Sequence, residues 1–163
     1  MAYNYSTVLG DSARMSGSMD PTTLSNNTGD GETVYFGGPA GGGLKEGALY
    51  YLKNDGNWAS ASAEATGSGH NQLLGICQGT NPNTDGMLTR GYFDATDYLS
   101  GAFVKGGPLY VCSSSFGHDS FLTCAVPGTE MDASDAYVRV VGYSTDVANV
   151  IYFNPSSTYV EIA

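Results

Sequence analysis

The fold is decided by a stretch that occurs twice, first as Leu44-Lys45-Glu46-Gly47-Ala48-Leu49-Tyr50-Tyr51-Leu52 and later as Val104-Lys105-Gly106-Gly107-Pro108-Leu109-Tyr110-Val111. In each copy a glycine-containing turn leads into a strand of leucine and tyrosine. A second apolar strand with an internal glycine follows each copy, at residues 73–76 and 140–143. Internal repetition of this kind predicts one β unit built from two similar halves. Neither copy carries a reactive group, so the repeat indicates a structural module.

Outward from the repeat, nearly all of the chain after residue 44 reads as strand and turn. Asn54-Asp55-Gly56-Asn57 predicts a hairpin turn between strands at residues 49–53 and 58–61. Short strands separated by turns are typical of an all-β, antiparallel barrel or sandwich, and the sequence leaves both open. No segment keeps a helical period for ten residues, which excludes parallel βαβ units. Further strands are expected at residues 73–78, 87–93, 109–112, 121–125, 137–143, 150–153 and 158–162.

Residues 1–42 differ from the rest and predict an extended N-terminal arm that ends in a Gly/Pro hinge, with the β-barrel or sandwich domain at residues 43–163. The hinge, residues 37–43, is GGPAGGG, in which we expect neither helix nor strand. It is no phosphate loop, because Leu44 follows its last glycine. The alternative to a docking arm is a mobile tail. The isolated apolar anchors expected to contact a partner are Tyr3, Tyr5, Leu24, Val34, Tyr35 and Phe36.

The composition restricts the class of partner. The 163 residues carry 16 acidic and 6 basic side chains, a net charge of −10, which argues against nucleic acid and against an anionic membrane surface. The first residues have no basic region and no apolar run, so we expect no signal peptide, and no stretch is long enough for a membrane span. Three cysteines do not make a disulfide framework, and we expect them to be buried as small apolar residues.

The candidates for chemistry are weak, and we expect no catalytic residue, no metal and no cofactor. His70 and His118 lie in predicted loops, where exposed turn polars are the simpler interpretation. Several aspartates lie in predicted loops of the kind that bind calcium, but their spacing matches no recognised calcium-binding motif. They are Asp94, Asp97, Asp132, Asp135 and Asp146. Aromatic side chains can also line a carbohydrate site. For the aromatic residues here we favour packing in a core or an interface over a carbohydrate platform. These residues are Tyr50, Tyr51, Trp58, Tyr92, Tyr98 and Tyr110.

Several of these motifs together resemble a domain of tailed-bacteriophage structural proteins, of the kind found in cyanophages and other aquatic phages. The motifs are the first copy of the repeat, Trp58, Leu74-Gly75-Ile76, and Gly86-Met87-Leu88-Thr89-Arg90-Gly91-Tyr92-Phe93, with the endings at residues 140–143, 151–155 and 158–162. The first half is also similar to the small trimeric head-decoration proteins of lambdoid phages. The resemblance covers roughly residues 43–163.

The resemblance implies a non-enzymatic capsid decoration (cement) protein, made in the host bacterial cytoplasm and bound to the outer surface of the virion. Such a protein would form a homotrimer and stabilise contacts between major capsid proteins. We expect the arm to dock on the major capsid protein by strand addition and apolar burial, so that deleting residues 1–36 abolishes binding while the domain still folds. The alternative is a receptor-binding domain of a tail fibre or tail spike.

Overall fold

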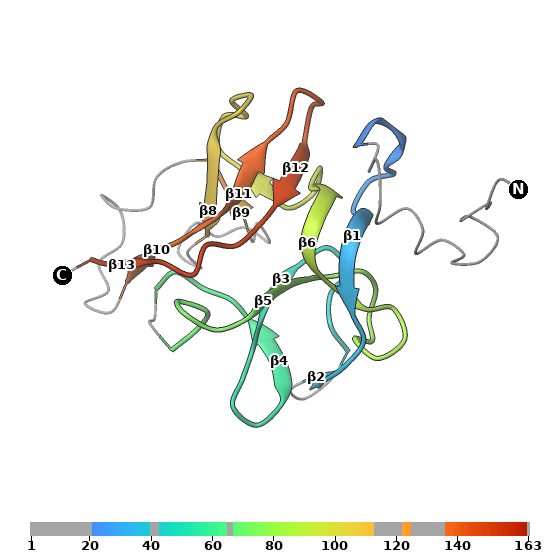
Figure 1. Cartoon of the computed structure of the whole chain (residues 1–163), viewed down its shortest axis with the longest axis vertical. Helices are drawn as coiled ribbons and strands as arrows, with labels where there is room; N and C mark the ends of the chain where they lie inside the picture. The colour runs from blue at the N-terminus through green and yellow to red at the C-terminus, as the bar shows by residue number, and fades with distance from the viewer. Residues whose placement is uncertain (1–20, 40–42, 65–66, 113–121, 125–135, 163) are drawn as a thin grey trace, which may run out of the picture.

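A computed structural model of the chain describes residues 21–39, 43–64, 67–112, 122–124 and 136–162 (Figure 1). Within these ranges the chain forms one short 3-10 helix and otherwise strands and turns, which confirms the all-β prediction. The elements are η2 (Pro21–Thr23), β1 (Gly29–Val34), β2 (Gly38–Pro39), β3 (Leu49–Leu52), β4 (Asn57–Ser60), β5 (Leu74–Cys77), β6 (Met87–Asp94), β7 (Leu99–Ser100), β8 (Pro108–Val111), β9 (Leu122–Thr123), β10 (Tyr137–Val138), β11 (Val140–Ser144), β12 (Val150–Phe153) and β13 (Val160–Glu161).

Eleven of these strands form one curled sheet in the order β2-β4-β3-β5-β6-β12-β11-β8-β9-β7, with β1 also paired to β6. All neighbours are antiparallel except β2 with β4 and β7 with β9. Strands β10 and β13 form a separate pair. Figure 1 shows β2 to β5 in one half of the molecule and β8, β9, β11 and β12 in the other, with β1 and β6 between them. The curled sheet therefore resembles half of a barrel.

Strand β6 joins the two halves. Its first residues, Met87 and Leu88, pair with β5, while Gly91 to Asp94 pair with β12. Strand β1 runs antiparallel along the other edge of β6, from Gly29 opposite Phe93 to Val34 opposite Met87. One strand thus belongs to both halves of the sheet and has three partners.

The repeat is real at the level of the turn. In the first copy the N–H of Ala48 donates to the carbonyl of Lys45 (3.2 Å), and in the second the N–H of Gly107 donates to Val104 (2.9 Å). The third turn position is Gly47 in one copy and Gly106 in the other, with φ of 79° and 73°. A type II turn requires positive φ at this position, which glycine adopts without strain. The matching residues are therefore Gly47 and Gly106, a shift of one residue from the alignment of the leucines.

Each copy then bonds to its partner strand in the same way. The N–H of Gly47 donates to Cys77 (2.7 Å), and that of Gly106 donates to Ser144 (3.0 Å). Two residues before each acceptor in the partner strand is an internal glycine, Gly75 in β5 opposite Tyr50 and Gly142 in β11 opposite Leu109. Turn, strand and glycine-containing partner strand therefore recur as one unit.

The buried side chains form two clusters. The main core lies between the halves and takes Leu49 and Ile76 from the first half and Leu109 and Val141 from the second. The second core lies on the other face of β3, β4 and β5. It consists of Leu44, Ala48, Tyr50, Trp58, Cys77 and Met87, with Val34 and Leu52 packed against it. The first half is therefore covered on both faces.

The segment before residue 43 differs from the predicted arm over its described part. Gly29–Val34 pairs along the whole of β6, and Gly38–Pro39 pairs with Asn57 and Trp58 in β4, although no strand was expected in the glycine-rich hinge. Proline is tolerated here because β2 is the edge of the sheet, where one side of the strand needs no ladder bond. Residues 1–20, the remainder of the predicted arm, lie outside the described residues.

Candidate functional site

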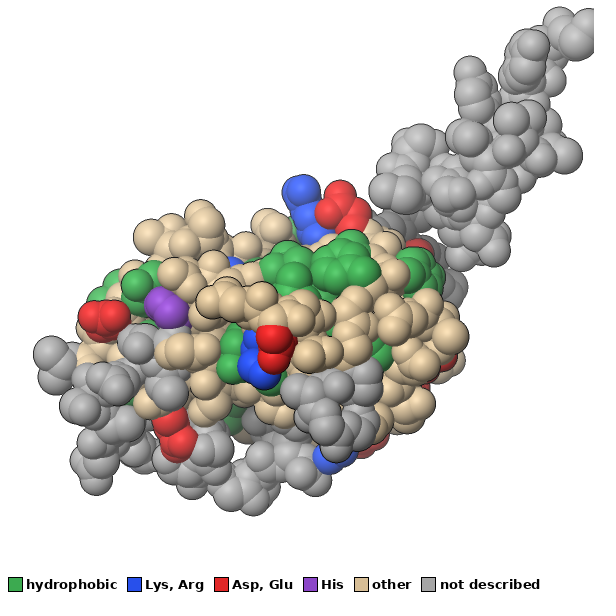
Figure 2. Space-filling view, turned by 90° about the horizontal axis from the view of Figure 1, so that it is seen from below, with side chains coloured by type: hydrophobic (Ala, Val, Ile, Leu, Met, Phe, Trp, Pro, Cys, Tyr) green, Lys and Arg blue, Asp and Glu red, His purple; other side chains and the backbone are tan. Residues whose placement is uncertain are grey.

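Two large hydrophobic side chains are exposed next to each other in the link from β1 to β2. Tyr35 is 60% exposed and Phe36 is 42% exposed, and we call the pair the Tyr35–Phe36 patch. Figure 2 views the molecule from the end at which β2 and β4 lie and shows hydrophobic side chains gathered on this face. Exposed aromatic residues in a contiguous patch mark an interaction surface more often than scattered single ones do.

Each ring of the patch packs against the body of the domain, Phe36 on the second core and Tyr35 on the backbone of Gly86. The ring of Phe36 stacks on that of Trp58 at 5.9 Å between centroids, and the indole N–H of Trp58 donates to the Phe36 carbonyl at 2.8 Å. Trp58 itself is fully buried. On the other side, a Cβ added to Gly86 would lie 2.9 Å from the Tyr35 ring, so this ring packs directly over the glycine backbone. Both aromatic rings are thus presented without having to be ordered on binding.

The structure brings together two of the six predicted contact residues. Tyr35 and Phe36 form the patch, whereas Val34 packs against the second core and is partly buried. Leu24 is half-buried before β1. Tyr3 and Tyr5 lie outside the described residues.

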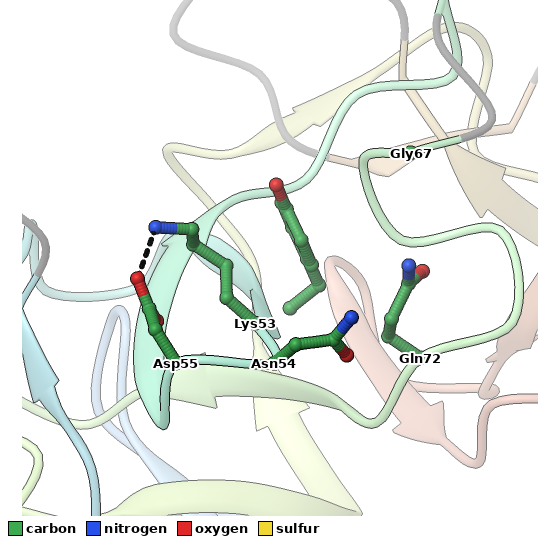
Figure 3. A pocket seen from close by; sticks show the side chains of 6 residues that line it. Lys53, Asn54, Asp55, Gly67 and Gln72 are labelled. Carbon is green, nitrogen blue, oxygen red and sulfur yellow. Dashed lines mark hydrogen bonds and ion pairs between the residues drawn. The ribbon is translucent and has the colours of Figure 1, made fainter.

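A shallow hollow of about 320 Å³ lies beside the β3–β4 hairpin (Figure 3). Its polar lining includes the Lys53–Asp55 ion pair, whose N–O distance is 2.6 Å. The hydrogen bond from Lys53 lowers the pKa of the Asp55 carboxyl, and the same bond raises the pKa of the Lys53 ammonium. Both groups are therefore charged at neutral pH and engaged with each other, which suits the hollow to binding a polar group rather than to proton transfer. The lining is Tyr51, Lys53, Asn54, Asp55, Gly67 and Gln72.

The predicted carbohydrate platform does not form. Four of its members are buried, which confirms the favoured interpretation of core packing: Tyr50, Trp58, Tyr98 and Tyr110. Burial raises the pKa of the Tyr50 hydroxyl, although this oxygen still accepts a hydrogen bond from the backbone N–H of Lys45 (2.8 Å). Tyr51 and Tyr92 are partly exposed.

His70 and Asp94, two other candidates for chemistry, are engaged in contacts within the fold. His70 lies edge-on to the rings of Tyr159 and Tyr137, at 4.7 Å and 6.1 Å between centroids. Asp94 is buried and accepts hydrogen bonds from the backbone and hydroxyl of Thr96. Over the described ranges, no group of three or more His, Cys, Asp and Glu side chains could hold a metal ion. His118, Asp132 and Asp135 lie outside the described residues.

None of the three cysteines is in a disulfide, and Cys77 and Cys112 are buried as expected. Burial raises the pKa of the Cys77 thiol, whose sulfur lies 2.9 Å from the Gly79 carbonyl oxygen and donates to it. A thiol with a raised pKa is protonated at neutral pH and is a poor nucleophile. Cys77 therefore serves the second core and not a reaction.

Sequence reasoning missed a buried charge in the second half. Arg139 is 5% exposed, and its guanidinium donates to three backbone carbonyls, those of Gly69 (2.6 Å), Gln72 (2.8 Å) and Ser156 (2.7 Å). Burial lowers the pKa of this guanidinium, which nevertheless stays charged. The side chain joins two loops to the sheet, and no periodicity in the sequence marks it.

No family model matches this chain, and no curated protein and no solved structure matches it either. Among the described residues, no helix is both long and apolar enough to cross a membrane.

Proposed function

We propose that this chain is a non-enzymatic decoration protein of a tailed-bacteriophage capsid, which binds the outer surface of the head and stabilises contacts between major capsid proteins. The observation that carries the proposal is the Tyr35–Phe36 patch, since two rigidly held aromatic rings lie in the segment predicted to dock. The resemblance of residues 43–163 to phage virion domains supplies the identity of the partner. Its functional unit would be a homotrimer.

Docking would combine apolar burial with strand addition. Within the described residues β1 has β6 as its one strand partner, so its outer edge is open to a strand from another chain. The Tyr35–Phe36 patch directly follows β1. A capsid segment that extended the sheet at β1 would therefore end beside two exposed rings, which is the arrangement that gives β-augmentation both affinity and register.

The described surface supports a binding protein rather than an enzyme. The charged pair in the hollow is engaged, the buried thiol is protonated, and His70 packs among tyrosine rings. None of these groups presents a nucleophile beside a general base, the arrangement that nucleophilic hydrolysis requires.

The test is uptake by capsids that lack their decoration protein, measured as bound copies per capsid and as the temperature at which DNA is released. The double variant Tyr35→Ala, Phe36→Ala should lose uptake, because it removes both exposed rings. Val104→Ala is the matched control, since Val104 is 61% exposed in the second copy of the repeat and lies outside the patch. Equal uptake by wild type and the double variant would contradict the proposal.

A truncation that tests docking alone must end before residue 36, the end point that the sequence indicated. Removing residues 1–36 would remove β1, and with it Val34 from the second core, so that variant tests folding as well as docking. Removing residues 1–20 leaves η2 and β1 intact. We expect this shorter truncation to fold and to reduce uptake, because Tyr3 and Tyr5 are lost.

A receptor-binding domain of a tail fibre or tail spike is the second candidate. The hollow lined by Tyr51, Asn54 and Gln72 favours it, because an aromatic ring beside amide groups suits a polar ligand on a cell surface. Binding of the labelled protein to host cells, with no uptake by capsids, would select this function over decoration.

A further inference from the structure

Three tyrosines lie in one row across the outer surface of the second half. Tyr92 in β6 is the register partner of Tyr152 in β12, and Tyr152 is the partner of Tyr143 in β11. The row continues to Pro108 in β8 at one end and to Asp30 in β1 at the other. We call Tyr92, Tyr152 and Tyr143 the tyrosine row. It crosses three strands that are adjacent in the sheet (Figure 1).

The row faces away from the main core. Side chains alternate between the faces of a strand, and the neighbours of the row in sequence, Phe93 and Ile151, are fully buried in the core. Tyr143 is 48% exposed, and Tyr92 and Tyr152 are partly exposed. The rings of Tyr92 and Tyr152 contact each other at 5.4 Å between centroids.

Hydrogen-bonding groups of both charges flank the row. The Arg90 Nε donates to the Tyr152 hydroxyl at 3.2 Å, which fixes the ring, and Glu32 is the register partner of Arg90. Asp30 lies opposite Tyr92, and the exposed Asn154 follows the end of β12, two residues after Tyr152. The surface therefore offers a cation balanced by carboxylates, an amide and phenol hydroxyls around flat apolar rings.

We propose that the tyrosine row is a binding site for a neutral glycan. The C–H faces of sugar rings stack on aromatic rings, and their hydroxyls need donors and acceptors at the margin, both of which the row provides. Neighbouring strands are about 4.8 Å apart, close to the width of a sugar ring, so an extended glycan along the row can meet one tyrosine on each strand. A polyanion is disfavoured because Glu32 and Asp30 outnumber Arg90 here, on a chain of net charge −10.

The exposed area favours a glycan over a protein partner. Three tyrosine rings with these exposures offer at most about 300 Å², since a whole aromatic side chain covers about 150–250 Å². A standard protein interface buries about 800 Å² per partner and is centred on an apolar core. The row by itself supplies less than half of that area. It is also remote from the Tyr35–Phe36 patch, because five residues of extended chain from Asp30 to Tyr35 span about 16 Å.

Affinity gel electrophoresis of the full chain tests the proposal, with gels that contain a neutral glucan, mannan, galactan or xylan, or an anionic polysaccharide. We expect at least one neutral polymer to retard the wild type. Tyr143→Ala and Tyr152→Ala should each weaken that retardation at least tenfold. Tyr152→Phe should retain most of it because the ring remains. Val160→Ala is the control and should behave as wild type, because Val160 is 66% exposed in β13, outside both the row and the Tyr35–Phe36 patch. Thermal unfolding of each variant shows that its fold is kept.

Four results would overturn the proposal. The first is no retardation by any neutral polymer, and the second is retardation by the anionic polymer alone. The third is equal retardation of wild type and Tyr143→Ala. The fourth is self-association or capsid uptake that Tyr143→Ala abolishes while no glycan binds, which would make the row a protein interface. Capsid uptake measured on Tyr35→Ala, Phe36→Ala tests the proposed function separately, so either proposal can fail alone.

Discussion

The strand after Gly47 and the strand after Gly106 begin with the same turn and the same hydrogen bond to a partner strand, yet they present different surfaces. In the first half, Leu49 faces the main core while Tyr50 faces the second core. In the second half, Leu109 lies opposite Gly142 as Tyr50 lies opposite Gly75, yet Leu109 faces the main core. Tyr143, which follows Gly142 as the fully buried Ile76 follows Gly75, is half exposed. A repeated backbone motif therefore sets hydrogen bonding but not burial. What covers its outer face comes from outside the repeat, here from Val34 in β1 and Trp58 in β4.

The largest expected difference between the two halves is the loss of stability when the second core is disrupted. Trp58→Ala should lower the free energy of unfolding by about 3–5 kcal/mol, because Trp58 is fully buried and the truncation leaves a cavity. Urea unfolding followed by circular dichroism is the measurement, since Trp58 is the only tryptophan. Tyr143→Ala, on the open face of the second half, should change the free energy of unfolding by no more than about 0.5 kcal/mol. Similar losses in the two variants would show that the halves are covered alike.

The second-largest difference in stability is expected between alanine variants of the two matched glycines, Gly75 and Gly142. A methyl group at Gly142 would collide with the Tyr152 carbonyl oxygen, which is fixed backbone. At Gly75 the nearest atoms are side-chain carbons of Met87 and Trp58, at 3.2 Å and 3.3 Å. We expect Gly142→Ala to cost about 3 kcal/mol and Gly75→Ala about 1 kcal/mol in urea unfolding. Equal losses of unfolding free energy in the two variants would mean that moving β11 away from β12 costs no more than shifting the side chains of Met87 and Trp58.

The turn glycines provide a finer comparison. Alanine at either Gly47 or Gly106 must adopt positive φ, which costs about 1–2 kcal/mol. At Gly47 the methyl group would also strike the Tyr98 ring, whereas at Gly106 nothing lies within 4 Å. Gly47→Ala should therefore be the more destabilising of the two by about 1 kcal/mol, as measured by thermal unfolding. If Gly106→Ala were the worse variant, the equivalence of the two turns would be wrong.

The smallest difference concerns the loops that follow the two partner strands. After β5, the Asp85 carboxylate accepts the backbone N–H groups of Thr80 and Asn81 at 2.8 Å and 2.9 Å, which lower its pKa. After β11, a hydroxyl has the same role, since Thr145 accepts the N–H of Val147 at 3.1 Å. A hydroxyl does not titrate in this range, so pH should affect the loop after β5 and not the loop after β11.

The sign of the pH effect follows from the lowered pKa. A carboxyl whose pKa is lower folded than unfolded stabilises the fold above the unfolded value of about 3.9, and this contribution is lost as the pH falls through the folded value. Asp85→Asn should therefore reduce the melting temperature at pH 7 and flatten its decline in acid. Thr145→Ala should lower the melting temperature equally at both pH values. An acid decline that Asp85→Asn leaves unchanged would contradict this account.

The strands of the body were predictable because their signals are local. Asp55-Gly56 marks the β3–β4 hairpin, and alternating apolar residues mark the region of β10 and β11. Strand β1 was missed because Gly29-Asp30-Gly31 has the composition of a turn. Its strand conformation depends on pairing with β6, sixty residues away in sequence, and such pairing overrides local propensity.

The candidate sites show the same division. Exposure of Tyr35 and Phe36 was foreseen, since no periodic apolar pattern surrounds them. The tyrosine row was not, because alternation would place Tyr143 on the same face as the buried Val141, and only its pairing with Tyr152 places it on the outer face. Their proximity depends on the order β6-β12-β11, and the sequence left the order of the strands open. The buried Arg139 depends likewise on where two loops meet the sheet in space.

The position of β6 between both halves also has a consequence for synthesis on the ribosome. Strands β1 and β5 precede β6 in the chain and can pair with it as soon as it emerges, whereas Gly91 to Asp94 must wait for β12, near the end of the chain. At about 5–20 residues per second, several seconds pass before that partner is made. During this time the edge of β6 at Gly91 to Asp94 lacks its strand partner, so the two halves of the sheet cannot be completed in the order in which they are made.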